Sequence, residues 1–235
     1  MYRLFSTPGW FNGWDIVIES FGFIVALFIA LFSWRIYRLH KENRFAYFSL
    51  AFILVALGLL VKAGTSSILY FTPVRDVAAD VLRPVAGAGL KFSYLWYRSG
   101  FLLHMIPMLG AWLLLFFISQ KSRARLHKFH EVTQMALFIY LILLISIVAN
   151  FKYFVFYLTS SVLLALIVLN YYKHSLNIAK KRNALLVMMA FLLILLGNLF
   201  FVFVFLQNGL YVIGELFQLV GFLLLLYVYS TVIRR

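Results

Sequence analysis

Seven stretches of about twenty mostly apolar residues divide this chain, and each is long enough to cross the hydrocarbon core of a bilayer. They are Asp15–Trp34, Ala46–Tyr70, Gly100–Ser119, Thr133–Ala149, Tyr153–Tyr172, Ala184–Leu206 and Tyr211–Ile233. Inside lipid a spanning segment must satisfy its own backbone hydrogen bonds, and a run of this length does so as a helix. The sequence therefore predicts an all-α polytopic membrane protein with seven transmembrane helices, built as a single domain over residues 1–235.

The composition supports lipid as the main solvent of this chain. Hydrophobic residues make up 65% of it and charged residues only 12%, whereas charged residues supply about a quarter of a soluble domain. The net charge of +14 is spread over short clusters between apolar runs, so we expect a lipid bilayer and no nucleic acid as a partner. The absence of cysteine excludes disulfides, thiol catalysis and thiolate-bound metal.

Lysine and arginine alternate between the two sides of the predicted membrane. The linkers after the first, third and fifth spans, together with the C-terminal tail, hold fourteen of the 21 basic residues. Positive linkers face the cytoplasm in membrane proteins, so the N-terminus is predicted outside and the C-terminus in the cytoplasm of a cell-membrane protein. The one long external loop, residues 71–98, is expected to hold a short interfacial helix that either rests on lipid or covers the outer mouth.

Polar side chains inside the spans gather in the outer half of the predicted bilayer. They are Glu19, Lys62, His104, Asn198, Glu215 and Gln218. An ionisable group in lipid normally turns toward the protein interior and finds a partner. One interpretation is an outward-facing pocket in which Lys62 neutralises one glutamate and leaves the other for a proton, a cation or a ligand amine. The other interpretation is a structural network, with Glu19 paired to Lys62 and Glu215 bonded to Asn198 or Gln218.

Several chemistries do not fit the sequence. No lysine occurs between Tyr211 and Thr231 for a retinal Schiff base, and no phosphate-binding glycine loop is present. Only His104 is an intramembrane histidine, which excludes a bis-histidine haem. A metal enzyme could gather His127 and His130 near Glu131, with His40 and His174 on the same side, but basic neighbours disfavour a cation there. We therefore expect no cofactor, no metal and no enzymatic activity.

Two stretches resemble a known class of sensor. The junction RLHKENRFAYFSLAFILVALGLLVKA and the tail GFLLLLYVYSTVIRR are similar to the seven-helix sensor regions at the N-terminus of some membrane histidine kinases. The resemblance covers the whole chain and implies a sensor, but the chain reaches Arg235 without a kinase domain. A sensor of this kind is expected to signal through a separate cytoplasmic or membrane partner.

These observations favour a non-enzymatic sensor or receptor that binds a small ligand from the outer side. The alternatives are a small transporter or channel, which needs a polar route through the inner half of the membrane, and a structural subunit of a larger membrane complex.

Overall fold

Six long helices make up most of the described protein, and each is long and apolar enough to cross a bilayer. The computed structural model describes residues 8–71, 92–121, 153–176 and 181–233, together with positions 73 and 77. Its helices are α1 (Trp14–His40), α2 (Asn43–Tyr70), α4 (Phe92–Lys121), α6 (Tyr153–Leu176), α7 (Lys181–Val202) and α8 (Gly209–Ile233), preceded by the short η1 (Gly9–Phe11). The all-helical membrane class is confirmed for these residues, while the fourth predicted span, Thr133–Ala149, lies outside them.

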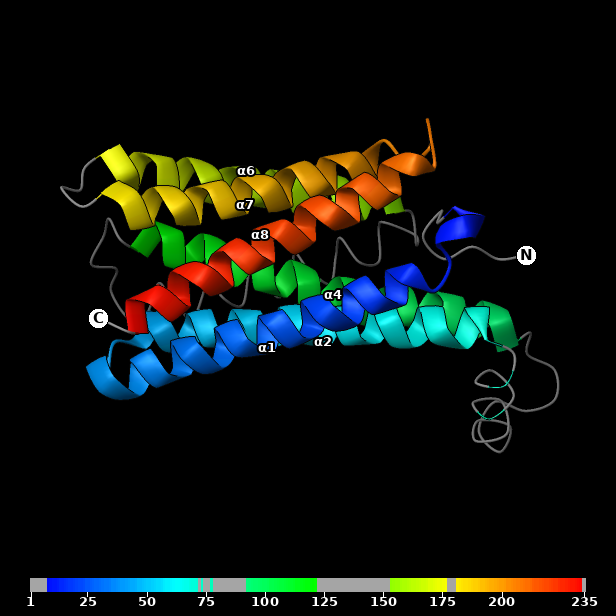
Figure 1. Cartoon of the computed structure of the whole chain (residues 1–235), viewed down its shortest axis with the longest axis horizontal. Helices are drawn as coiled ribbons and strands as arrows, with labels where there is room; N and C mark the ends of the chain where they lie inside the picture. Colours follow the sequence, from blue (N-terminus) through cyan, green and yellow to red (C-terminus); the bar gives the residue numbers. More distant parts are fainter. Residues whose placement is uncertain are drawn as a thin grey trace.

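The helices run side by side along the long axis of the molecule (Figure 1). Neighbours in contact follow the order α1, α2, α4, α6, α7 and α8, and α8 returns to α1 to close a ring. We call the end of the bundle that holds Trp14 the N-terminal end and the end that holds Ile233 the C-terminal end (Figure 1). Both Trp14 and Tyr70 therefore lie at the N-terminal end, while the α1–α2 turn lies at the C-terminal end.

The polarity of α1 is the reverse of that of a soluble amphipathic helix. Its outward stripe consists of Val17, Phe21, Ile24, Phe28 and Leu31, each 46–61% exposed. Its inward face carries the buried acids Asp15 and Glu19. Apolar side chains outside and carboxylates inside fit a helix whose outer solvent is lipid, because charged groups in membranes turn toward the protein.

A seam of small residues brings α7 and α8 into backbone contact. A Cβ added at Gly197 would lie 2.7 Å from the Gly214 carbonyl oxygen, and one added at Gly214 would lie 2.9 Å from the Gly197 carbonyl oxygen. Seven residues further along α8, a Cβ at Gly221 would lie 2.9 Å from the carbonyl oxygen of Ala190. Close approach at small residues is the usual basis of helix packing in lipid, where hydrophobicity does not drive association. These two helices, which are consecutive in the chain, therefore pack very closely against each other.

Several helix boundaries differ from the sequence prediction, and α4 begins at Phe92, inside the stretch 71–98 that was predicted as an external loop. The predicted sixth span ended at Leu206, but α7 ends at Val202 and residues 203–206 form turns with hydrogen bonds to the third preceding carbonyl. The chain must tighten there to reverse into α8. At the other end of the bundle, α1 continues to His40, so only Lys41 and Glu42 separate it from α2. Lys41 adopts the left-handed conformation, with φ of 56°, that this sharp turn requires.

Candidate functional site: a buried ionic triad

Three charged side chains meet inside the N-terminal half of the bundle. Lys62 Nζ lies 2.9 Å from Glu19 Oε1 and 2.5 Å from Glu215 Oε1. The residues come from α2, α1 and α8, and none is more than 3% exposed. We refer to Glu19, Lys62 and Glu215 as the ionic triad. It joins the first and second helices of the chain to the last described one.

Helix spacing and small residues bring the three groups together. Glu19 lies on the inward face of α1 one turn before Gly22, where the side chain of Leu59 approaches to 3.3 Å of an added Cβ. This contact draws α2 against α1 at the level of Lys62, one turn beyond Gly58 and Leu59. Glu215 follows Gly214 of the α7–α8 seam, so the closest crossing of those helices adjoins the triad.

Aromatic rings enclose the ammonium group of Lys62. Its Nζ lies 5.2 Å from the ring centroid of Tyr211 and 5.6 Å from that of Phe201. The Tyr211 hydroxyl also donates to Glu19 Oε1 over 3.5 Å, a long hydrogen bond. A desolvated cation over an aromatic face is stabilised by the ring quadrupole. The site is therefore built to hold a cationic group in a low-dielectric setting.

The charges of the ionic triad do not balance. Two carboxylates share one ammonium, and Glu19 Oε2 is buried with no hydrogen-bond partner in the described chain. A net charge buried in this way costs several kcal/mol unless a proton or a cation compensates it. The arrangement can therefore take up one proton or one small cation.

The other predicted site residues lie near the triad but bond elsewhere. His104 Nδ1 donates to the Gly58 carbonyl over 2.9 Å, and its ring meets Phe156 edge-on. Asn198 donates to the Ile194 carbonyl of its own helix over 3.0 Å. Gln218 is buried in the α7–α8 crossing, where its Cγ would lie 2.8 Å from a Cβ added at Gly197. The structural interpretation paired Glu19 with Lys62, and this ion pair is present. The same interpretation bonded Glu215 to Asn198 or Gln218, whereas Glu215 accepts a hydrogen bond from Lys62.

A cavity of about 110 Å³ lies at the N-terminal end between α6, α7 and α8. We call it the N-terminal cavity. Tyr157, Phe201 and Tyr211 line it together with Tyr153, Phe154, Val202, Val204 and Phe205. The rings of Phe201 and Tyr211 both line this cavity and lie beside the Lys62 ammonium group. The hydroxyl of Tyr157, one of the lining residues, is buried and has no hydrogen-bond partner in the described chain.

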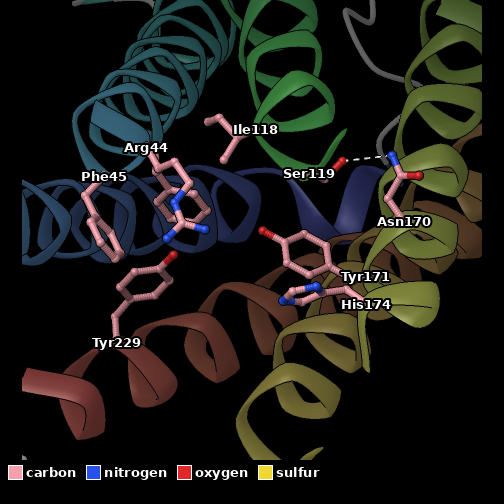
Figure 2. A pocket seen from close by; sticks show the side chains of 9 residues that line it. Arg44, Phe45, Ile118, Ser119, Asn170, Tyr171, His174 and Tyr229 are labelled. Carbon is pink, nitrogen blue, oxygen red and sulfur yellow. Dashed lines mark hydrogen bonds between the residues drawn. The ribbon is translucent and has the colours of Figure 1, made fainter. Parts of the chain in front are cut away.

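A second polar region, at the C-terminal end, was not anticipated as a site. Two adjoining cavities of about 170 and 210 Å³ share the lining residues Phe45, Tyr171, His174 and Tyr229. Arg44 and Asn170 line the first of them, where Asn170 donates to Ser119 over 3.0 Å (Figure 2). The sequence places Arg44 in a linker that sets topology, and it places His174 only on the side of the alternative metal site. It does not reveal that the helices continue past the apolar runs, so that both residues line a cavity.

The described residues contain no group of three or more histidine, cysteine or acidic side chains that could hold a metal ion. His127, His130 and Glu131, the residues of the alternative metal site, lie outside the described ranges. No family model, no curated protein and no solved structure matches the chain.

Proposed function

We propose that this protein is a membrane sensor whose sensing element is the ionic triad. The observation that carries the proposal is the sharing of one ammonium, Lys62, by two buried carboxylates at 2.5 and 2.9 Å. When Glu19 or Glu215 binds a proton or a small cation, its ion pair with Lys62 weakens, and Lys62 then pairs mainly with the other glutamate, on the other helix. Because Lys62 links α1, α2 and α8 at this level, the bound species biases their packing.

The topology that goes with this proposal has seven helices, with the N-terminal end outside. Ser119 and Asn170 are in contact near the C-terminal end, and Phe101 and Tyr153 are in contact near the N-terminal end, so α4 and α6 are parallel. The chain between them must connect opposite ends of the bundle, as a fourth span at Thr133–Ala149 would do. Arg35, Arg38, Lys41, Arg44 and Lys173 lie toward the C-terminal end, which supports its placement in the cytoplasm.

Access to the triad is proposed from the outer side through the N-terminal cavity. Its volume of about 110 Å³ holds a few water molecules at roughly 30 Å³ each. A proton or small cation can reach the rings of Phe201 and Tyr211 through such water. The resemblance to histidine kinase sensor regions is compatible with a signal that enters at the N-terminal end. The response would then pass to a separate partner at the C-terminal end.

The test uses the absence of cysteine in this chain. Val17→Cys on α1 and Ile213→Cys on α8 place spin labels at lipid-facing positions that are 57% and 40% exposed. The label-to-label distance is expected to change with external pH or with added Na⁺. Glu19→Gln and Glu215→Gln each leave a neutral pair and are expected to abolish the change.

Asp15→Asn is the matched control, because Asp15 lies one turn before Glu19 and instead accepts from Tyr70 over 3.0 Å. This variant should keep the response. A distance that stays constant across pH and Na⁺ concentration in the unsubstituted protein would refute the sensing role.

A structural subunit is the second candidate, and the direct contacts within the ionic triad favour it. Buried polar groups of this kind also hold helices together without binding anything. In that case Glu215→Gln would lower the stability of the bundle, and the label distance would be insensitive to pH and cations in every variant.

Transport is favoured by a different observation. The hydroxyls of Ser160 and Ser161 on α6 are buried without a hydrogen-bond partner in the described chain, one turn beyond Tyr157 toward the C-terminal end. Unsatisfied hydroxyls in an interior are places where water is stabilised. Proton or Na⁺ flux into sealed vesicles that is lost in Glu215→Gln would replace the sensor proposal with transport.

A further inference from the structure

The cavities at the C-terminal end combine basic and hydroxyl groups on one side with apolar walls on the other. Arg44 approaches from the start of α2, His174 and Tyr171 from the end of α6, and Tyr229 from the end of α8 (Figure 2). Ile36, Val187 and Val228 supply the apolar wall of the second cavity. All six long helices contribute to the two linings, so the cavities lie between the helices at this end of the bundle.

We infer that this region binds a small anionic group, a phosphate or a carboxylate, between Arg44, His174 and Tyr229. A guanidinium is the side chain best matched to both anions, because it can donate two parallel hydrogen bonds. Figure 2 shows the hydroxyls of Tyr171 and Tyr229 and the His174 ring directed into the same space as the Arg44 guanidinium. Neither cavity has an acidic side chain in its described lining.

The rings that carry these hydroxyls are held in place by stacking. Tyr229 stacks on Phe48 with ring centroids 4.8 Å apart, and Tyr171 stacks on Phe191 with centroids 5.4 Å apart. Anchored rings place their hydroxyls in the cavity at little further cost in side-chain entropy.

One acid competes for the guanidinium. Glu42 accepts from Arg44 Nε over 3.2 Å and from Arg44 Nη2 over 2.5 Å. This pair is on the surface, with the side chains 53% and 49% exposed, and such pairs hold little energy. An entering anion can therefore replace Glu42 in part of its hydrogen bonding to the Arg44 guanidinium. Removal of the Glu42 charge should strengthen the binding of the anion.

Size limits the ligand. Volumes of about 170 and 210 Å³ are below the range of roughly 300–1,000 Å³ that is typical of sites for drug-sized ligands. The group that fits is a single phosphate or carboxylate with a short apolar extension toward Val187 and Val228. The same chemistry is offered by a soluble anion and by the headgroup of an anionic lipid.

The experiment separates these sources with the full chain in phosphatidylcholine nanodiscs. Inorganic phosphate is titrated calorimetrically, and phosphatidic acid is added to a parallel set whose retained lipid is counted by native mass spectrometry. Saturable binding of phosphate identifies a soluble anion, and retention of phosphatidic acid without phosphate binding identifies a lipid headgroup. Either outcome supports the site, and the absence of both overturns it.

Three charge-changing variants test the location. Arg44→Gln should weaken binding by about tenfold or more, as expected for the loss of a charged hydrogen-bond donor. Arg38→Gln removes the same charge from an exposed position at the same end of the bundle, and Arg38 lines neither cavity. It should change binding by less than about twofold. Glu42→Gln should tighten binding. Equal losses in Arg44→Gln and Arg38→Gln would show a diffuse surface effect and overturn the assignment.

Tyr229→Phe provides a variant that preserves the stacking on Phe48 and removes only a hydroxyl. It should fold normally and bind several-fold more weakly, in keeping with the loss of one neutral hydrogen bond. Unchanged affinity in this variant and in Arg44→Gln would place any bound anion outside the cavities.

Discussion

Lys62 Nζ lies 2.5 Å from Glu215 Oε1, and this ion pair joins the second helix of the chain to the last described one across 153 residues. Its closeness explains why Lys62 tolerates burial, because a charge in lipid is stable only beside a partner. With Glu19 at 2.9 Å on the other side, Lys62 becomes the common point of three helices.

Replacement of Lys62 by methionine should be strongly destabilising. Lys62→Met keeps an unbranched side chain that is one heavy atom shorter, but it leaves two carboxylates buried together, and the breaking of a buried pair costs about 3–5 kcal/mol. The expected result is a lower midpoint of unfolding in detergent, followed by circular dichroism. The combined variant with Glu19→Gln and Glu215→Gln removes all three charges and should recover most of the loss. Failure of this recovery would mean that Lys62 stabilises the bundle mainly by packing.

The glycine seam between α7 and α8 should not accept a methyl group. Gly197→Ala places a Cβ 2.7 Å from the Gly214 carbonyl oxygen, so the helices must separate, at a cost of about 1–3 kcal/mol. Gly64→Ala is the control, since an added Cβ there meets nothing within 4 Å and should raise helix stability slightly. Thermal unfolding of the two variants should therefore shift in opposite directions.

Phe201 is expected to shield Lys62 from water in the N-terminal cavity. Phe201→Ala should expose the ammonium group to small water-soluble amine reagents, and peptide mass spectrometry would detect the modified Lys62. Phe205→Ala is the matched control, because Phe205 lines the same cavity but is 71% exposed. Equal modification of Lys62 in both variants would show that the Phe201 ring does not act as a barrier.

The carboxyl group of Glu42 should titrate below its ordinary pKa of 4.5, since the Arg44 hydrogen bond and then the Arg44 charge lower that pKa. The Glu42–Arg44 pair is therefore fully formed above pH 4.5 and is lost as the pH falls through the lowered value. Carbon NMR of labelled glutamate would report the midpoint. Arg44→Gln should return it close to 4.5, and an unchanged midpoint would mean that the pair does not form in solution.

The sequence was sufficient to predict the membrane class and to place the three charged residues at a common level along the bundle. Glu19, Lys62 and Glu215 were expected to share the outer half of the bilayer because each lies a similar distance from the same end of its span. Depth does not specify which helices are neighbours, so the contact of Lys62 with both acids could not be predicted. The bonding of Asn198 to Ile194 also could not be predicted, because a buried amide can satisfy itself on its own helix.

The C-terminal cavities were missed for a related reason. Hydropathy identifies the part of a helix in lipid, whereas α1 and α2 extend beyond it to a turn of only two residues. Arg44 therefore appeared to be in a linker, although it lies in the first turn of α2 and lines a cavity between the helices. The sequence did contain one indication of this cavity. Arg44 directly precedes an apolar run, and it lies within one helical turn of Phe45 and Phe48, which line the same cavity.

Because α2 is unbroken from Asn43 to Tyr70, Arg44 and Lys62 lie on one continuous helix. They are about 27 Å apart along its axis, at a rise of 1.5 Å per residue. A tilt or rotation of α2 that improves the fit at one end must alter the fit at the other. If the ionic triad and the C-terminal cavities each bind as proposed, occupancy at the two ends is thermodynamically linked, and this linkage is reciprocal. An anion bound at Arg44 that favours one position of α2 would then change the proton affinity of the triad by some factor. A proton bound at the triad would change the affinity for the anion by the same factor.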